Sequence, residues 1–197
     1  MTYVIEVLRQ EHRNIEKLLR VLEQELGVFD RGDRPNYEVV VGIFDYFKDY
    51  PDSCHHPKED MIFDKLKSRN PAAAAKMGDL RIEHVEEASR LRRAAQAVER
   101  VLADHDLLRE TVDEIIRDFI EHERQHMKME EQIFFPTALK ALRPKDWADI
   151  ALKLADRRDP LNGPDLEQKF SMLRRKILEI EAEAEAERRS KFMEEMS

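Results

Sequence analysis

The sequence predicts an all-α protein, an antiparallel up-down-up-down four-helix bundle with extra helices at its C-terminal end. Charged residues make up 39% of the 197-residue chain, which has only five glycines. This balance favours long helices over sheets. Four long segments carry apolar residues at alternating steps of three and four, the spacing of one helical face. Turn-forming residues separate these segments, as a bundle with short connections requires.

The first predicted helix carries one apolar stripe that also contains a histidine. Its members are Ile5, Leu8, His12, Ile15, Leu19, Leu22 and Leu26. Glycine is the usual residue just past a helix end, so Gly27 is predicted to close this helix.

The second predicted helix follows a turn-rich stretch at residues 30–36 and runs through Ile43, Phe47 and Tyr50. Pro51 and Pro57 each lack a backbone donor, so we expect a kink or break there. Asp52 and Ser53 offer a new N-cap, and the helix is expected to restart from it.

Asn70 and Pro71 form a cap and first-turn pair that is predicted to open the third helix. Its stripe contains Met77, Leu80, His84, Leu91, Val98 and Leu102. The fourth stripe contains Leu108, Val112, Ile115, Phe119, His122, His126, Met129 and Ile133. Pro136 and Pro144 are predicted to break that last helix.

The length suits one buried core with an appendage. We predict a metal-binding bundle over residues 1–142 and a helical appendage over residues 143–197. The appendage contains a short helix around Trp147 and Ile150 and a charge-rich helix from Asp165 onward. We expect it to cover the bundle or to pair two copies of the chain as a homodimer.

Composition excludes several classes of protein. The formal net charge is -8 and no face is dominated by Lys and Arg, so neither nucleic acid nor an anionic membrane surface is an expected partner. No apolar run approaches the roughly 20 residues that span a bilayer, and the first residues lack a signal-peptide pattern. A cytoplasmic location is therefore expected. The single cysteine, Cys54, allows no internal disulfide, and no nucleophile elbow or phosphate-binding glycine loop occurs.

Histidines and glutamates recur on the inward stripes. His55 and Glu59 are four residues apart, as are His126 and Glu130, so each pair projects from one helical face. Buried ionisable groups without partners cost several kcal/mol each, roughly, which a bound cation offsets. The sequence therefore predicts a two-metal site with the ligands His12, His55, Glu59, His84, His126 and Glu130. Mixed nitrogen and oxygen ligation suits iron or manganese, with zinc as a substitute.

Further polar residues lie next to these ligands. His122 lies one turn before His126 and is a candidate for an extra ligand or for a hydrogen bond to a ligand. His56, Asp60, Glu123 and Glu131 also lie next to the ligands, as surface charges or helix-pairing residues. His56, Glu123 and Glu131 are in addition candidates for a further ligand or for a residue that orients a ligand. Aromatic residues expected near the level of the site are Tyr46, Phe47, Tyr50, Phe119 and Phe134.

The order His12, His55-His56-Pro57-Lys58-Glu59, His84, His126-Met127-Lys128-Met129-Glu130 resembles the hemerythrin-like proteins with an HHE cation-binding domain. The resemblance covers residues 1–142. It implies a non-haem di-iron centre in a four-helix bundle, with an oxo or hydroxo bridge between the irons and both glutamates bridging them. Oxygen-carrying relatives usually have a second histidine four residues after the one on the third helix, where this chain has Ala88.

Two classes of function follow from this resemblance. In the first, the di-iron centre reacts with oxygen, peroxide or nitric oxide at an open position, and the absence of one imidazole favours peroxide decomposition or nitric-oxide handling. In the second, the chain is an iron or oxygen sensor, or an iron-storage or iron-sulfur repair module, without turnover. A ferritin-like bundle is the structural rival, but it needs two Glu-x-x-His pairs. Only Glu123 and His126 have that spacing here.

Overall fold

Every regular element that the structure describes is a helix. The computed structural model describes residues 2–103, 108–154, 173, 175, 178 and 179. Within these residues no strand is present, so the predicted all-α class is confirmed. None of the described helices is apolar over a length that would carry the chain across a bilayer.

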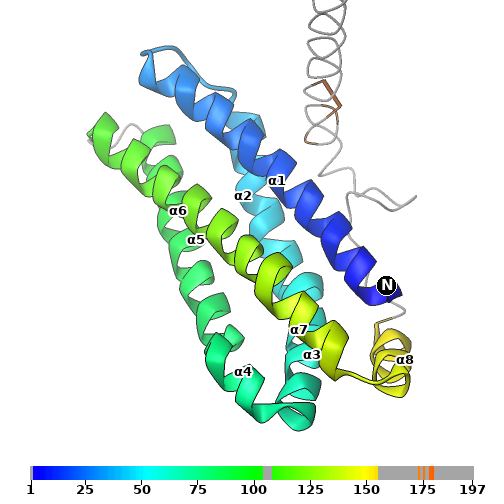
Figure 1. Cartoon of the computed structure of the whole chain (residues 1–197). Helices are drawn as coiled ribbons and strands as arrows, with labels where there is room; N and C mark the ends of the chain where they lie inside the picture. Colours follow the sequence, from blue (N-terminus) through cyan, green and yellow to red (C-terminus); the bar gives the residue numbers. More distant parts are fainter. Residues whose placement is uncertain (1, 104–107, 155–172, 174, 176–177, 180–197) are drawn as a thin grey trace, which may run out of the picture.

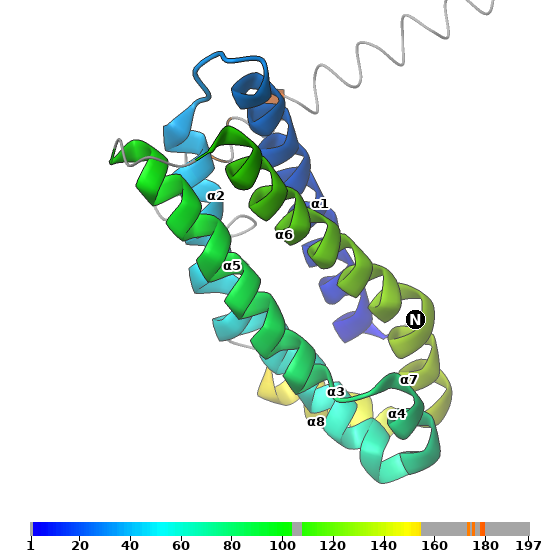
Figure 2. The same cartoon turned by 90° about the vertical axis from the view of Figure 1, so that its left-hand side faces the viewer.

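Four long helical paths lie side by side and make up most of the described chain (Figure 1). The elements in chain order are α1 (Tyr3–Asp30), α2 (Tyr37–Tyr50), η1 (Pro51–His55), α3 (His56–Arg69), α4 (Pro71–Met77), α5 (Leu80–Leu102), α6 (Arg109–Met129), η2 (Glu130–Phe134), α7 (Phe135–Ala141) and α8 (Pro144–Lys153). The helix α1 contacts α2 and α6, and α5 contacts the same two helices. The four paths are therefore α1, α2 with α3, α5, and α6 with α7, as the turned view in Figure 2 also shows.

The first helix ends at a later residue than predicted, and the third helix begins at a later residue than predicted. The helix α1 passes through Gly27 and ends at Asp30, followed by Gly32 with a φ of 85°. A helical glycine costs only about 1 kcal/mol, so Gly27 does not suffice to stop a helix. Asn70 does cap a helix, because its side chain accepts from the Ala73 amide, but only the short α4 follows. Gly78, with a φ of 81°, separates α4 from α5, and Asp79 caps α5 by accepting from the Arg81 amide.

The predicted restart of the second helix from a new cap at Asp52 and Ser53 does not occur. The π-helical turn η1 carries the chain from α2 into α3, and no new cap forms at Ser53. The Ser53 hydroxyl instead donates to the Asp49 carbonyl. On an uninterrupted α-helix the residue one turn after Tyr50 would be Cys54, whereas the wider turn places His55 at the buried position. The π-helical turn η1 thus places the His55 side chain in the core.

A second π-helical turn, η2, joins α6 to α7 and contains Glu130. Pro136 falls in the first turn of α7, where its missing donor is tolerated, and the predicted break at Pro136 does not occur. The Thr137 hydroxyl donates to the Ile133 carbonyl at 2.6 Å. Such turns often mark functional sites within long helices, and both of them here adjoin the candidate ligands.

Two apolar clusters fill the core, and a polar layer lies between them. One cluster is built from Ile15 to Leu26 of α1 together with inward residues of α2, α5 and α6. The other contains Ile5 and Leu8 of α1 and residues of α3, η2, α7 and α8, including Trp147 and Ile150. His12 lies between the two clusters along α1, and each other path likewise carries its histidines or glutamates between them. Apolar packing therefore closes the polar layer from both ends.

The predicted helix from Asp165 onward lies largely outside the described residues. Of that region Leu173 is described, and it is buried against the first apolar cluster. The predicted short helix around Trp147 corresponds to α8, which packs on α1 and α3.

Candidate metal centre

All six residues predicted as metal ligands are buried in the polar layer. Their exposed fractions are 7% or less, and Glu59 and Glu130 are fully buried. The six come from all four helical paths: His12 (α1), His55 (η1), Glu59 (α3), His84 (α5), His126 (α6) and Glu130 (η2). Chain segments far apart in the sequence thus bring four imidazoles and two carboxylates together.

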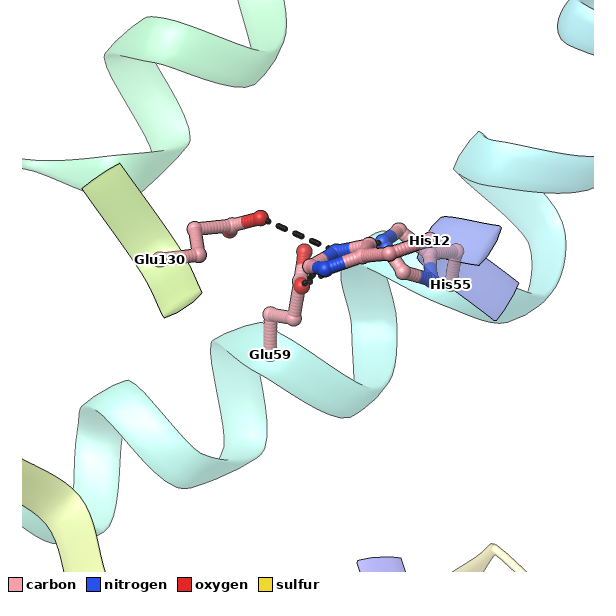
Figure 3. Close-up of side chains that lie close together, drawn as sticks. All are labelled: His12, His55, Glu59 and Glu130. Atoms are coloured by element: carbon pink, nitrogen blue, oxygen red, sulfur yellow. Dashed lines mark hydrogen bonds and ion pairs between the residues drawn. The ribbon is translucent and has the colours of Figure 1, made fainter. Parts of the chain in front are cut away.

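The first group of donors is His12, His55, Glu59 and Glu130, drawn in Figure 3. The Nε2 atoms of His12 and His55 lie 3.2 Å apart. The Nε2 of His12 is 3.2 Å from Glu130 Oε2, and the Nε2 of His55 is 3.3 Å from Glu59 Oε1. Two donors that each lie about 2.1 Å from one cation, about 90° apart, are separated by about 3 Å. The group therefore fits one ion.

The second group contains Glu59, His84, His126 and Glu130. The Nε2 of His126 is 3.1 Å from Glu130 Oε1, and the Nε2 of His84 is 3.6 Å from Glu59 Oε2. The rings of the two histidines meet edge to face at 5.3 Å. These donors could hold a second cation beside the first.

Both glutamates face both positions. Glu59 directs Oε1 towards His55 and Oε2 towards His84. Glu130 directs Oε2 towards His12 and Oε1 towards His126. Each carboxylate therefore has the orientation of a bridge between two cations.

The donor atoms lack the hydrogen bonds that buried polar atoms normally make. Both carboxylate oxygens of Glu59 and of Glu130 have no hydrogen-bond partner among the described residues, and neither do the Nε2 atoms of His84 and His126. Buried polar atoms without partners are rare in native proteins. The site is therefore incomplete without positive charge at its centre.

In the first group of donors, the Nδ1 atom of each histidine contacts a carboxylate that is not among the six predicted ligands. The Nδ1 of His12 bonds to Glu131 at 3.1 Å, and the Nδ1 of His55 bonds to Glu11 at 2.8 Å. When Nδ1 donates to a carboxylate, the neutral ring presents its Nε2 lone pair to the centre. Two such lone pairs 3.2 Å apart repel each other unless a cation lies beside them.

More carboxylates surround the histidines of the second group, His84 and His126, than those of the first group. The Nδ1 of His126 lies 3.1 Å from Glu83 and 3.3 Å from Glu87, and the Nδ1 of His84 lies 3.6 Å from Asp60. The prediction that Glu131 orients a histidine agrees with its position. Sequence reasoning missed Glu11, Glu83 and Glu87, because each one serves a histidine on a different helix.

A buried lysine supports the His55 side. Lys58 is 1% exposed, and its ammonium group donates to Glu11 and, at 3.4 Å, to the hydroxyl of Tyr50. Although burial opposes ionisation, the hydrogen bond from His55 and the charges of His55 and Lys58 lower the pKa of Glu11. A chain of contacts therefore runs from Lys58 through Glu11 to His55. The lysine keeps Glu11 anionic, and Glu11 fixes the ring.

His56 and Glu123 lie next to the six predicted ligands. The ring of His56 stacks on His84 at 4.0 Å and 10°, and its Nε2 is 3.3 Å from Glu87. The ligand atoms of His56, His84 and Glu87 lie within 4.8 Å of one another, so these residues form a third candidate group for a cation, which shares His84 with the second group. Burial and the charge of Glu87 raise the pKa of Glu123 to about 8.

His122 is not among the convergent donor groups of the described chain. It is partly buried, and its Nε2 has no hydrogen-bond partner among the described residues. Its role as a further ligand remains a prediction. Among the aromatic residues, Phe135 was not singled out in the sequence, yet its ring stacks on His12 at 5.4 Å. Phe134 is fully buried next to Phe135.

Without metal, protons take the place of cations at this site. Although burial opposes it, the nearby carboxylates of Glu130, Glu131 and Glu59 raise the pKa of His12 well above its ordinary value. Burial likewise opposes the charge on His126, but Glu130 and Glu87 raise its pKa. Burial and Glu59 act to raise the pKa of Glu130, yet His126 and His12 hold it at about 2. The layer is therefore organised to hold positive charge.

Comparison with known proteins agrees with this geometry. The family model described as hemerythrin HHE cation binding domain matches residues 3–138. The chain belongs to the hemerythrin HHE cation-binding family. Comparisons with curated proteins and with solved structures found no match. The matched residues contain every residue of both HHE donor groups and the carboxylates that hold the histidines.

The turn of α5 that follows His84 carries Ala88 and no histidine. Ala88 is partly buried and has no donor atom in its side chain. The inward residue on this turn of α5 is Glu87, which faces His126 and His56. No imidazole from the turn of α5 after His84 reaches the centre.

We predict that Glu130→Gln, which removes one bridging charge, lowers the metal content from about two ions per chain to about one or fewer. Elemental analysis after reconstitution and gel filtration measures this content. Glu121→Gln is the matched control, because Glu121 is exposed on α6 and bonds only to Gln125 in the described contacts. Equal metal contents in both variants would contradict the bridging role.

We predict that Lys58→Met lowers the unfolding free energy by about 3–5 kcal/mol, because Glu11 then remains buried without its cation. It should also weaken metal binding by about 10–100-fold through His55. Urea denaturation and metal titration measure the two effects. The control Lys48→Met breaks the exposed pair with Glu99 and should cost less than about 1 kcal/mol. A Lys58 variant as stable as this control would refute the relay.

We predict that the metal-free protein loses stability as the pH rises above about 6.5. The raised pKa values of His12 and His126 stabilise the fold fully below the ordinary histidine value of 6.5, and this stabilisation disappears as the pH rises through the folded values. Glu130, with its lowered pKa, stabilises the fold above 4.5 and loses this effect as the pH falls towards 2. Denaturation with a chelator should therefore show greater stability near about pH 5.5 than near about pH 8.5. The opposite order would be inconsistent with these shifts.

Proposed function

We propose that this HHE domain binds two iron ions and that the pair reacts with a small ligand, either oxygen, peroxide or nitric oxide. The observation that carries the proposal is the orientation of Glu59 and Glu130, each with one oxygen towards each pair of histidines. His12, His55, His84 and His126 are the proposed nitrogen ligands. Each ion thereby receives two imidazoles and two carboxylate oxygens from the chain.

The number of donors favours iron or manganese over zinc. Four protein donors saturate the tetrahedral preference of zinc, whereas a catalytic or ligand-binding metal needs an open position. Iron and manganese accept mixed histidine and carboxylate sets that leave positions open. Iron is the proposed native metal, and manganese and zinc are the proposed substitutes.

The chain's own residues orient the histidine rings, balance the buried charges and exclude water from the centre. Bound iron supplies one-electron redox steps and an open position for an exogenous ligand. Glu131 and Glu11 hold His12 and His55 with their Nε2 atoms towards the centre. Phe135 covers one face of His12, and the two apolar clusters exclude water from both ends of the layer.

The absence of an imidazole donor at Ala88 supports reaction over simple oxygen carriage. With fewer strong ligands, the ion held by His84 and His126 is more accessible to exogenous ligands. We therefore favour peroxide decomposition or nitric-oxide handling. The alternative, a sensor, storage or repair module without turnover, depends in its sensor form on the region after residue 154, most of which lies outside the described residues.

Two finer aspects of the architecture belong to the same proposal. We propose that the four paths run up, down, up and down, which the contacts of α1 with α2 and α6, and of α5 with both, support. We also propose residues 1–142 as the metal-binding unit and residues 143–197 as an appendage. The packing of α8 on α1 and α3 indicates that the start of this appendage is in contact with the unit.

The test is reconstitution with iron(II) under anaerobic conditions, followed by spectroscopy. We predict that nitric oxide changes the optical spectrum of the loaded protein, and that peroxide releases oxygen faster than with the same concentration of free iron. The loaded Glu130→Gln protein should lose both responses, while Glu121→Gln should keep them. A wild-type protein that binds two irons but responds to neither ligand would refute the reactive function and leave storage as the better proposal.

A further inference from the structure

A third group of metal-binding side chains lies next to the second group of donors. It consists of His56 on α3 with His84 and Glu87 on α5, and its ligand atoms lie within 4.8 Å of one another. The Nε2 of His56 is 3.3 Å from Glu87 Oε2. Mixed imidazole and carboxylate donors suit divalent cations such as iron(II) and manganese(II). Only His84 of this group belongs to the six predicted ligands, so the group is a candidate site of its own.

Glu87 is the member of this third group that most requires a cation. It is 3% exposed, and neither of its carboxylate oxygens has a hydrogen-bond partner among the described residues. Its ion-pair contacts are with two imidazoles, the Nε2 of His56 and the Nδ1 of His126, each at 3.3 Å. Buried carboxylates are normally hydrogen-bonded or paired with a cation. Glu87 therefore has lone pairs available for a metal ion.

The carboxylates around the third group have no cationic side chain to neutralise them. In the ion pairs between described residues, Glu83 and Glu87 meet only histidines, and no Lys or Arg pairs with Glu123. Burial and the charge of Glu87 raise the pKa of Glu123 to about 8. Beside the first group of donors, by contrast, Lys58 pairs with Glu11. Negative charge therefore remains at the third group for a cation from outside the chain.

Exposure to solvent falls step by step from the surface through the third group to the centre. Glu83 and Glu87 both contact the Nδ1 of His126, at 3.1 and 3.3 Å, so their carboxylates lie close together. The side chain of Glu83 is 34% exposed, whereas those of His56 and Glu87 are 13% and 4% exposed. Glu59, at the centre, is fully buried. A partly exposed carboxylate thus leads to the group, and negative charge at such an opening attracts cations.

His84 connects the third group to the second. Its Nε2 is 3.6 Å from Glu59 Oε2, and its ring stacks on His56 at 4.0 Å. A neutral imidazole has one acceptor nitrogen, so His84 holds one ion at a time. An ion in the third group and an ion in the second group therefore compete for the same ring. The second group has four donor residues and the third has three, which favours the second position for an ion that stays.

We propose that His56, Glu87 and His84 form an entry site that binds a divalent cation and passes it to the second position through His84. The inference rests on the pair of metal ions in the proposed function and names the route by which an ion reaches it. The ion exchanges ligands and changes no oxidation state in this step. The entry site is occupied only in transit, so the loaded protein holds about two ions per chain and not three.

The experiment follows uptake and release of cobalt(II) by the metal-free, full-length chain in a stopped-flow instrument. Cobalt(II) accepts the same nitrogen and oxygen donors, and its visible absorption changes when it binds. The test variants are His56→Phe, which keeps a ring beside His84 without a donor nitrogen, and Glu87→Gln. The matched control is Glu86→Gln, which makes the same charge change at the exposed neighbouring residue of α5.

We expect uptake to slow by about tenfold in both test variants and to stay within about twofold of the wild type in the control. Release to an excess of chelator should slow by a similar factor, because an ion leaves by the route through which it enters. Elemental analysis after gel filtration should give about two ions per chain in all four proteins. Damage to the ligands of the resident ions would speed up release instead.

Unchanged uptake in either test variant, or an equal loss of rate in the control, would overturn the entry site. A final content of about one ion per chain in a test variant, or faster release, would also overturn it, because the changed residue would then hold a resident ion. If the wild type takes up two ions and the test variants match it, the proposed function stands and this inference fails. If the wild type binds no cobalt, both fail. Uptake that depends on His56 and Glu87 in a protein whose iron form reacts with no small ligand would support the entry site and refute the proposed reaction.

Discussion

The structure depends on the charge balance at two fully buried carboxylates. Glu59 and Glu130 lie between two apolar clusters, at a depth where an isolated anion is expensive. Four imidazoles face them, and each imidazole is held by its Nδ1 towards a carboxylate farther out. This nested arrangement of charges is unfavourable unless positive charge lies at its centre. The proposed pair of metal ions would balance it, and raised pKa values favour protons on His12 and His126 in their absence.

The two sides of the centre are electrostatically different. On the His12 and His55 side, each outer carboxylate has its own cation, since Arg9 pairs with Glu131 and Lys58 with Glu11. On the His126 side, Glu83 and Glu87 approach one ring, and the pKa of Glu123 is raised to about 8 by burial and by Glu87. The second position is therefore surrounded by more negative charge. This asymmetry gives a physical reason for the two ions to differ in affinity and reactivity.

Helical periodicity explains why so much of the site could be predicted from the sequence. Ligands such as His12 and His84 occupy the same stripes as core leucines, and pairs such as His55 and Glu59 have the spacing of one turn. Of the outer carboxylates, Glu131 was predicted because it follows Glu130, but Glu11, Glu83 and Glu87 could not be found in this way. Glu11 precedes His12 and Glu83 precedes His84, so each points about 100° away from its neighbour and serves a histidine of another helix. Only the packing of the helices shows which ring each of them meets.

The local errors in the fold have a related cause. Pro51 and Pro57 predict an interruption of the second helix, because proline removes a backbone hydrogen bond from an α-helix. A π-helical turn instead continues the helical path at Pro51 and places His55 in the core. The burial of Lys58 could not be predicted, because lysines are rarely buried. Its role depends on Glu11, which only the packing of α1 places next to it. Gly27 predicts the end of the first helix, but α1 continues to Asp30.

Two cations are proposed to lie between the four histidines, bridged by Glu59 and Glu130. A crystal structure of the iron-loaded protein, with anomalous data collected at the iron absorption edge, tests it most directly. We expect two anomalous peaks about 3.5–4 Å apart, one next to His12 and His55 and the other next to His84 and His126. A single peak, or peaks away from these residues, would contradict it.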